Sequence, residues 1–191
     1  MTVPRRLCSL LAAVLVAGGL SACGKHQSTG LVRVAETEGI YLDVNDLKYQ
    51  VQVSRQFNPF DAQDEPFLAG IPEGQRQLEP NEVWFGVLMR VQNETDEALR
   101  PAAEIEITDT QGDVFEPLML MDSNLFAYRP SEPVPPESIV PLPDTPAFDS
   151  ASRGVLLLFK LTLDALNNRP LELELEGRGM PQQTGIINLD V

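Results

Sequence analysis

Hydrophobic and polar residues alternate over most of the chain after residue 39. In residues 47–53, LKYQVQV, every second side chain is apolar, and LELELEG at residues 171–177 alternates without a break. Such alternation is typical of a β-strand with one face on a core and the other in water. Both segments therefore predict strands, and the three glutamates of the second segment are expected on its solvated face. IYLDV, residues 40–44, predicts a further short strand.

One predicted strand is apolar on both faces. In EVWFGVLMRVQN, residues 82–93, Val83, Phe85 and Val87 share one face, while Trp84 and Leu88 lie on the other. This pattern predicts a central strand that is covered on both sides for part of its length. GVLLLFKLTL, residues 154–163, predicts another buried strand. AEIEITDTQGDVF, residues 103–115, predicts a hairpin whose turn includes Gly112.

Two irregular segments separate these strands. Residues 57–80 form a long insertion rich in aromatic and acidic side chains, and residues 124–146 contain seven prolines around a short predicted strand, SIVPL. Because proline cannot donate to a strand ladder, the second segment is expected at a sheet edge or as a crossover. The pattern after residue 39 predicts an all-β fold, an immunoglobulin-like antiparallel β-sandwich of about seven to eight strands over residues 39–191.

The first 22 residues are typical of a secretory signal. Arg5 and Arg6 precede an apolar run, residues 7–20, which as a helix reaches about 21 Å and is too short for a hydrocarbon core of about 30 Å. The run ends in Leu-Ser-Ala-Cys, which resembles the lipobox of bacterial lipoproteins. The resemblance implies cleavage before Cys23 and a diacylglycerol on its thiol; the alternative is an ordinary cleaved signal with an incidental cysteine. We therefore expect the protein to be lipid-anchored to a membrane through Cys23 and to face outside the cytoplasm.

Charge and cysteine content narrow the classes of function. Residues 23–38 are expected to form a flexible tether in which His26 is a solvated residue. The chain holds 14 basic and 28 acidic residues, so loss of Arg5 and Arg6 with the signal makes the net charge −16. Such a domain is repelled by phosphates, which argues against nucleic-acid binding. Its surface would also be repelled by anionic headgroups, so the lipid on Cys23 is expected to hold the protein on the membrane. With Cys8 removed and Cys23 acylated, no disulfide or cysteine-bound metal is expected.

Catalytic and metal chemistry find little support in these residues. A zinc site or histidine-dependent hydrolase needs a histidine in the folded domain, and the sequence has none after His26. We expect a protein that is not an enzyme and needs no cofactor. A carboxylate-based hydrolase remains an alternative, as does an accessory role in metal binding. The candidate ligands are methionines for Cu(I), namely Met119, Met121 and Met89, or a calcium loop with Asp61, Asp64 and Glu65.

The remaining function is binding. In the insertion, five residues would form an apolar patch rimmed by acids if they were exposed: Phe57, Pro59, Phe60, Phe67 and Leu68. Such a patch is the pattern of a contact surface for a protein partner at the membrane face. The alternative is structural, with the insertion folding back over an edge or end of the sandwich.

Several short motifs resemble a family of uncharacterised immunoglobulin-like lipoproteins of Gram-positive bacteria, related to a secreted mycobacterial immunogenic protein. They are the strand end Val91-Gln92-Asn93, the polar turn at residues 94–99, the hairpin turn at residues 109–112, and the strand at residues 154–159. With the lipobox, the resemblance covers about half of the chain. It implies an immunoglobulin-like sandwich and supplies no catalytic residues. The insertion and the proline-rich crossover are longer than this family pattern implies.

Overall fold

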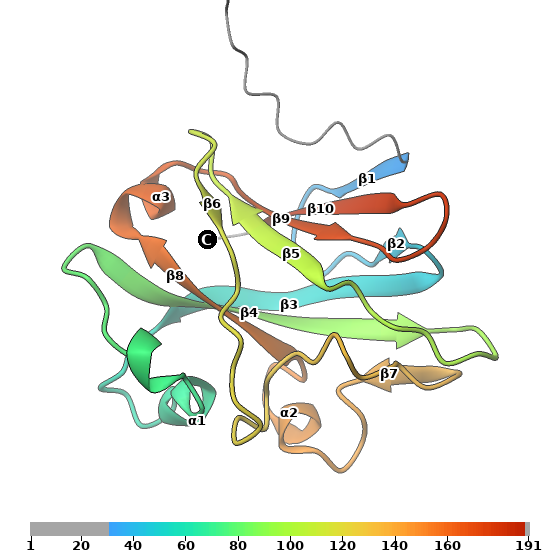
Figure 1. Ribbon diagram of the computed structural model, residues 1–191, viewed down its shortest axis with the longest axis horizontal. Helices are drawn as coiled ribbons and strands as arrows, with labels where there is room; N and C mark the ends of the chain where they lie inside the picture. The colour runs from blue at the N-terminus through green and yellow to red at the C-terminus, as the bar shows by residue number, and fades with distance from the viewer. Residues whose placement is uncertain (1–30, 190–191) are drawn as a thin grey trace, which may run out of the picture.

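Two β-sheets pack face to face in the computed structural model, which describes residues 31–189 (Figure 1). The first sheet has the order β1 (Leu31–Ala35), β10 (Gln183–Leu189), β9 (Leu171–Glu176), β5 (Glu104–Thr108) and β6 (Val114–Phe115). The second has the order β2 (Leu42–Val44), β3 (Leu47–Phe57), β4 (Glu82–Asn93) and β7 (Ser138–Val140), with β8 (Val155–Thr162) also paired to β4.

The predicted all-β sandwich is confirmed. The chain crosses from the second sheet to the first after β4 and again after β8, as in Greek-key sandwiches. Two details differ from the prediction: the sheets hold ten strands, and β1 pairs with β10 in the parallel direction. The helices are short, namely α1 (Glu65–Leu68), η1 (Glu73–Gln75), α2 (Pro146–Asp149) and α3 (Leu163–Asn167). None of those found within residues 31–189 is long and apolar enough to cross a bilayer.

The prediction of a flexible tether through residue 38 is wrong for residues 31–38. Leu31 to Ala35 form β1, in register with Gln183 to Ile187 of β10, and the side chain of Ala35 is buried. Beyond the strand, the carboxylate of Glu38 accepts hydrogen bonds from the backbone amide and the hydroxyl of Ser54 on β3. The sandwich therefore begins eight residues earlier than the alternation indicates, because a parallel edge strand needs only the ladder of its neighbour. Cys23 and the predicted signal lie outside the described residues.

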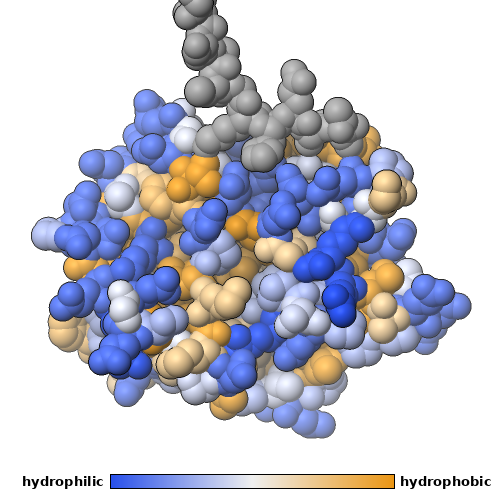
Figure 2. Space-filling view, in the orientation of Figure 1, coloured by the Kyte–Doolittle hydropathy of each residue, from blue (hydrophilic) through white to orange (hydrophobic). Residues whose placement is uncertain are grey.

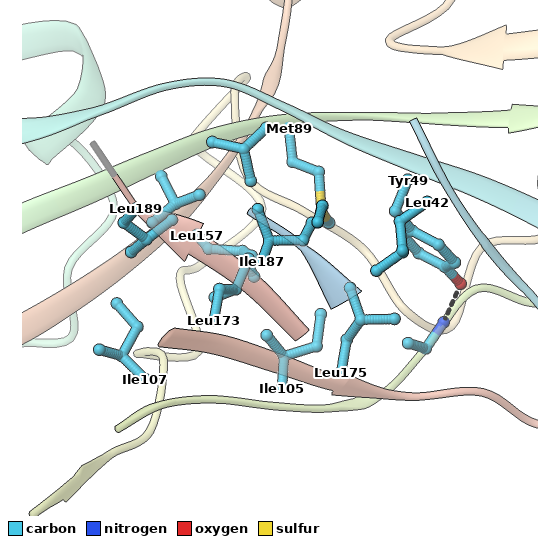
Figure 3. Packing of buried hydrophobic residues seen from close by; sticks show 14 of the residues in the cluster. Leu42, Tyr49, Met89, Ile105, Ile107, Leu157, Leu173, Leu175, Ile187 and Leu189 are labelled. Atoms are coloured by element: carbon cyan, nitrogen blue, oxygen red, sulfur yellow. Dashed lines mark hydrogen bonds between the residues drawn. The ribbon is translucent and has the colours of Figure 1, made fainter. Parts of the chain in front are cut away.

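The main core lies between the two sheets (Figure 3). Alternate residues of β9 and β5 point inward from one sheet and meet Tyr49, Met89 and Leu157 from the other. The leucines of β9 are fully buried, and each such side chain contributes about 1.5–3 kcal/mol relative to an exposed one. The glutamates of β9 lie on the opposite face, as the alternation predicts.

A second core covers the outer face of the second sheet. Trp84, Leu88 and Leu158 point away from the main core and are buried by the insertion and by residues 118–127. The prediction that β4 is covered on both sides is thus confirmed. The insertion provides much of this cover through Phe57, Ile71 and partly buried neighbours, with α1 below the sheet in Figure 1.

The predicted hairpin is present as β5 and β6. Asp109 is buried at its turn, where one carboxylate oxygen accepts hydrogen bonds from the amides of Gln111 and Asp113, each at 2.9 Å. The other oxygen accepts from the side-chain amide of Asn168 at 2.9 Å. Burial alone would raise the pKa of Asp109, but these donors stabilise the carboxylate, so that its pKa is lowered. The turn is therefore stabilised by an ionised side chain.

Candidate binding pocket

A pocket of about 300 Å³ opens where the proline-rich crossover passes β4 and β8. Its walls are mostly aliphatic and proline side chains from separate parts of the sequence: Val91, Pro101, Ala127, Val134, Pro141, Leu142, Ala147 and Val155. The volume is at the lower end of the range of small-ligand pockets, about 300–1,000 Å³. The β7 and α2 segments, lower right in Figure 1, contribute one side of it.

The polar side chains deeper in the pocket are already bonded to the protein. The Tyr128 hydroxyl donates to the Ala102 carbonyl at 2.6 Å, and the Thr145 hydroxyl donates to the Leu142 carbonyl at 2.7 Å. The Asn124 amide donates to the carbonyls of Phe67 and Ala69 on the insertion. These groups shape the pocket, whose lining combines aliphatic side chains with polar groups that are bonded to the protein.

Arg129 fixes the rim of the pocket. Its guanidinium donates to the carbonyls of Leu120 at 2.7 Å and Met121 at 2.8 Å, and lies 3.7 Å from a carboxylate oxygen of Asp122. The Asp122 side chain is exposed, so this ion pair is weak, and the exposed Glu132 adds a second carboxylate. The rim therefore carries two carboxylates and one guanidinium.

Two tyrosines connect the pocket to the main core. The amide of Ala102 donates to the Tyr49 hydroxyl at 2.8 Å, the bond drawn in Figure 3, while the Ala102 carbonyl accepts from Tyr128. Burial raises the pKa of Tyr49 to about 12, and burial likewise raises the pKa of Tyr128 well above its usual value. Both phenols stay protonated at neutral pH and serve as fixed hydrogen-bonding groups.

Asn93 holds the crossover against the end of β4. Its side-chain amide donates to the carbonyls of Glu97, Val134 and Pro135 at 2.7–3.1 Å, and its oxygen accepts from the backbone amide of Thr95 at 3.0 Å. The side chain of Asn93 is buried, and these bonds hold it within the turn. Asn93 positions one wall of the pocket.

The five contact residues predicted in the insertion do not form one exposed patch. Phe57 is buried under the second sheet, where its ring stacks on Phe67 at 5.1 Å between centroids. Phe67 in turn packs on Phe126 at 4.6 Å, and Leu68 packs against the same cluster. Phe60, which is 94% exposed, and the exposed Pro59 lie outside it. The outer face of β4 is apolar, and Phe57, Phe67 and Leu68 point inward because they cover it.

The candidate metal ligands are not brought together. Met89 is buried between the sheets, whereas Met119 and Met121 are exposed on either side of Leu120, whose side chain enters the second core. The three sulfurs therefore do not share one surface. No cluster of three or more histidine, cysteine, aspartate or glutamate side chains suited to a metal ion occurs in residues 31–189.

Two of the three candidate calcium ligands, Asp61 and Asp64, accept hydrogen bonds within turns of the insertion. Asp64 is buried and pairs with Arg55, while its second oxygen accepts from the Asn58 amide at 2.8 Å. The hydrogen bond from Arg55 lowers the pKa of Asp64. Asp61 accepts from the Gln63 amide at 2.9 Å, and Glu65 is exposed at the start of α1. This bonding is that of a turn closed by an ion pair.

Comparison with known proteins supplies little further information. No family model and no curated protein matches this chain. One solved structure aligns with 11% sequence identity over 87% of this chain and 98% of the other, with a TM-score of 0.46. It is an uncharacterised β-sandwich protein from Clostridium difficile 630.

Sequence reasoning did not predict the pocket. Its walls come from β4, β7, α2, β8 and the loops between them, and each wall residue taken alone has the pattern of an ordinary core or loop position. The available signal was the density of prolines in residues 124–146. Prolines limit the pairing of this segment to the short β7 beside the end of β4, and the rest of the segment stays outside the sheet.

Proposed function

We propose that this chain is a lipid-anchored, extracytoplasmic binding module whose ligand site is the crossover pocket. The observation that carries the binding role is the pocket itself, because most of its lining residues are aliphatic or proline and its polar side chains are bonded internally. The anchoring role is supported by the lipobox-like sequence that ends at Cys23.

The chemistry of the pocket favours an aliphatic group that carries positive charge beside it. A pocket of this volume with mostly aliphatic and proline lining residues accommodates one apolar side chain, and the carboxylates of Asp122 and Glu132 outnumber the guanidinium of Arg129 at its rim. The strongly acidic domain would also attract a basic partner over a longer range. A protein segment with an apolar anchor residue next to lysine or arginine meets both conditions.

The resemblance to immunoglobulin-like lipoproteins is part of the same proposal. Two of its motifs coincide with turns that are stabilised by side chains, at Asn93 and at Asp109. Both turns support the resemblance at the level of the fold. They carry no information on the ligand.

Site-directed photo-crosslinking in the native membrane tests the pocket. A photo-reactive amino acid replaces Leu142, which is 38% exposed in the pocket wall, and in a separate variant replaces Leu163, which is 46% exposed on α3. We expect a discrete adduct from position 142 and none from position 163. A Leu125→Lys substitution at the pocket, in a side chain that is 63% exposed, should suppress that adduct by charge repulsion.

Two results would contradict the proposal. One is the absence of any adduct from position 142 in protein that is present at normal abundance. The other is an equal pattern of adducts from positions 142 and 163, which would indicate non-specific proximity. A partner whose crosslinked segment carries only acidic residues would refute the proposed ligand chemistry and leave the pocket as the site.

A further inference from the structure

We propose that the β1 edge of the sandwich rests on the surface of a phospholipid bilayer. The contact would be made by five exposed apolar side chains, defined here as the N-terminal edge: Leu31, Val32, Val34, Ile40 and Tyr41. This inference rests on the proposed lipid anchor at Cys23, and it adds an orientation of the domain relative to the membrane.

The exposure of this edge is unusual for a soluble sandwich. Leu31, Val32 and Val34 are 44–57% exposed, and Ile40 and Tyr41, just before β2, are 40–45% exposed. β1 is the outermost strand of its sheet, and edge strands of soluble proteins are usually protected by charged residues or proline. Apolar side chains at an open edge indicate a surface that is covered when the protein is in place.

The register of β1 shows which way these side chains point. Val32 lies opposite Thr184 and Val34 opposite Ile186, whereas Ala35, which is buried, lies opposite the inward-facing Ile187. Because neighbouring side chains in a strand alternate, Val32 and Val34 point to the outer face of the first sheet. They are therefore available to a surface outside the sandwich.

The position of Cys23 in the sequence points to the membrane as that surface. Leu31 is the eighth residue after Cys23, so the chain between them spans at most about 27 Å. A domain of this length is about 40 Å across. An acyl chain at Cys23 would thus hold the N-terminal edge close to the bilayer. The opposite end of the sandwich could contact the bilayer only if the domain rotated so that the N-terminal edge faced away from it.

Charge limits the contact to this edge. On the outer face of the first sheet, Glu104 lies opposite Glu176 and Glu106 opposite Glu174, two strands or more away from β1. Carboxylates are best solvated and would be repelled by anionic headgroups. The N-terminal edge carries one exposed cation, Arg33, which by the alternation points to the opposite face from Val32 and Val34, and the exposed Glu36 follows β1, so the contact is mainly apolar. On the face shown in Figure 2, hydrophilic residues are interspersed with apolar ones.

Fluorescence of a label at Val34 tests the contact. The full lipidated protein is placed in phosphatidylcholine vesicles, with one added cysteine at Val34 that carries an environment-sensitive fluorophore. The matched control carries the label at Leu163, which is 46% exposed on α3 at the other side of the sandwich (Figure 1). We expect a blue shift at position 34, loss of its emission when the vesicles contain spin-labelled lipid, and neither change at position 163.

Flotation of the same vesicles separates the two levels of the proposal. If the protein floats and the two labels respond equally, the edge contact is refuted and the anchor stands. If the protein does not float, the anchor and the edge contact both fail. If label 34 instead shows self-quenching that grows with the protein density on the vesicles, a second copy covers β1, and the bilayer contact is refuted.

Discussion

Replacing Phe57 by alanine tests whether the insertion is a structural cover. The Phe57 ring lies over Gly86, where even a methyl group would come within 2.1 Å of the ring, and it stacks on Phe67. The guanidinium of Arg55 lies 4.3 Å from the centroid of the same ring. Removal of a buried phenylalanine costs about 3–5 kcal/mol, and the loss of stacking and cation–π contact places this site in the upper half of that range.

Urea unfolding followed by the fluorescence of Trp84 measures this loss. Trp84 is the single tryptophan of the chain and is buried in the same cluster as Phe57. The matched control is Phe60→Ala, since Phe60 belongs to the same insertion and is 94% exposed, so its removal should change the free energy of unfolding by no more than about 0.5 kcal/mol. A Phe57→Ala variant as stable as Phe60→Ala would refute the structural role of the insertion.

Three further substitutions test the polar groups of the fold. Asp64→Asn should lower the free energy of unfolding by about 1.5–3 kcal/mol at pH 7, because Arg55 loses its ionised partner. Since the pKa of Asp64 is lowered in the folded state, that difference should shrink in unfolding curves as the pH falls through it. Tyr49→Phe leaves the Ala102 amide without an acceptor, a loss of about 1–3 kcal/mol. The pKa of Tyr49 is about 12 in the folded protein against 10 in the unfolded chain, so the free energy of unfolding of the wild type should fall between pH 10 and 12. The phenylalanine variant lacks this group, and its free energy of unfolding should fall less over that interval. Asn93→Ala should speed hydrogen exchange in residues 134–140, and unchanged exchange there would contradict its bracing role.

Strands with one buried face could be predicted from their sequence. β3 and β9 alternate because each residue pair places one side chain in the core and one in water. In β9 a one-residue shift of register would place the glutamates in the core, so its register is strongly specified. The two-sided apolar pattern of β4 predicted its cover as well. That pattern could also have decided between the two roles of the insertion, because Trp84 and Leu88 needed partners that no other predicted strand supplied.

β1 and β10 could not be predicted from alternation. In β10 the pattern is broken at Gly185, where β2 approaches so closely that an added methyl group would lie 2.8 Å from the side chains of Leu42 and Val44. β1 has exposed side chains on both faces and depends on β10 for its ladder. The pocket is similarly non-local, because Val91, Pro101 and Leu142 meet only after both sheets have formed.

Mass spectrometry of the N-terminal peptide tests the central claim, that Cys23 holds this binding domain on a membrane. The protein is purified from the membrane fraction of its native host, digested and analysed for its first residue and the mass on that residue. We expect a mature chain that begins at Cys23 and carries a diacylglycerol on the thiol. A mature chain that begins elsewhere, or one with an unmodified Cys23, would contradict it.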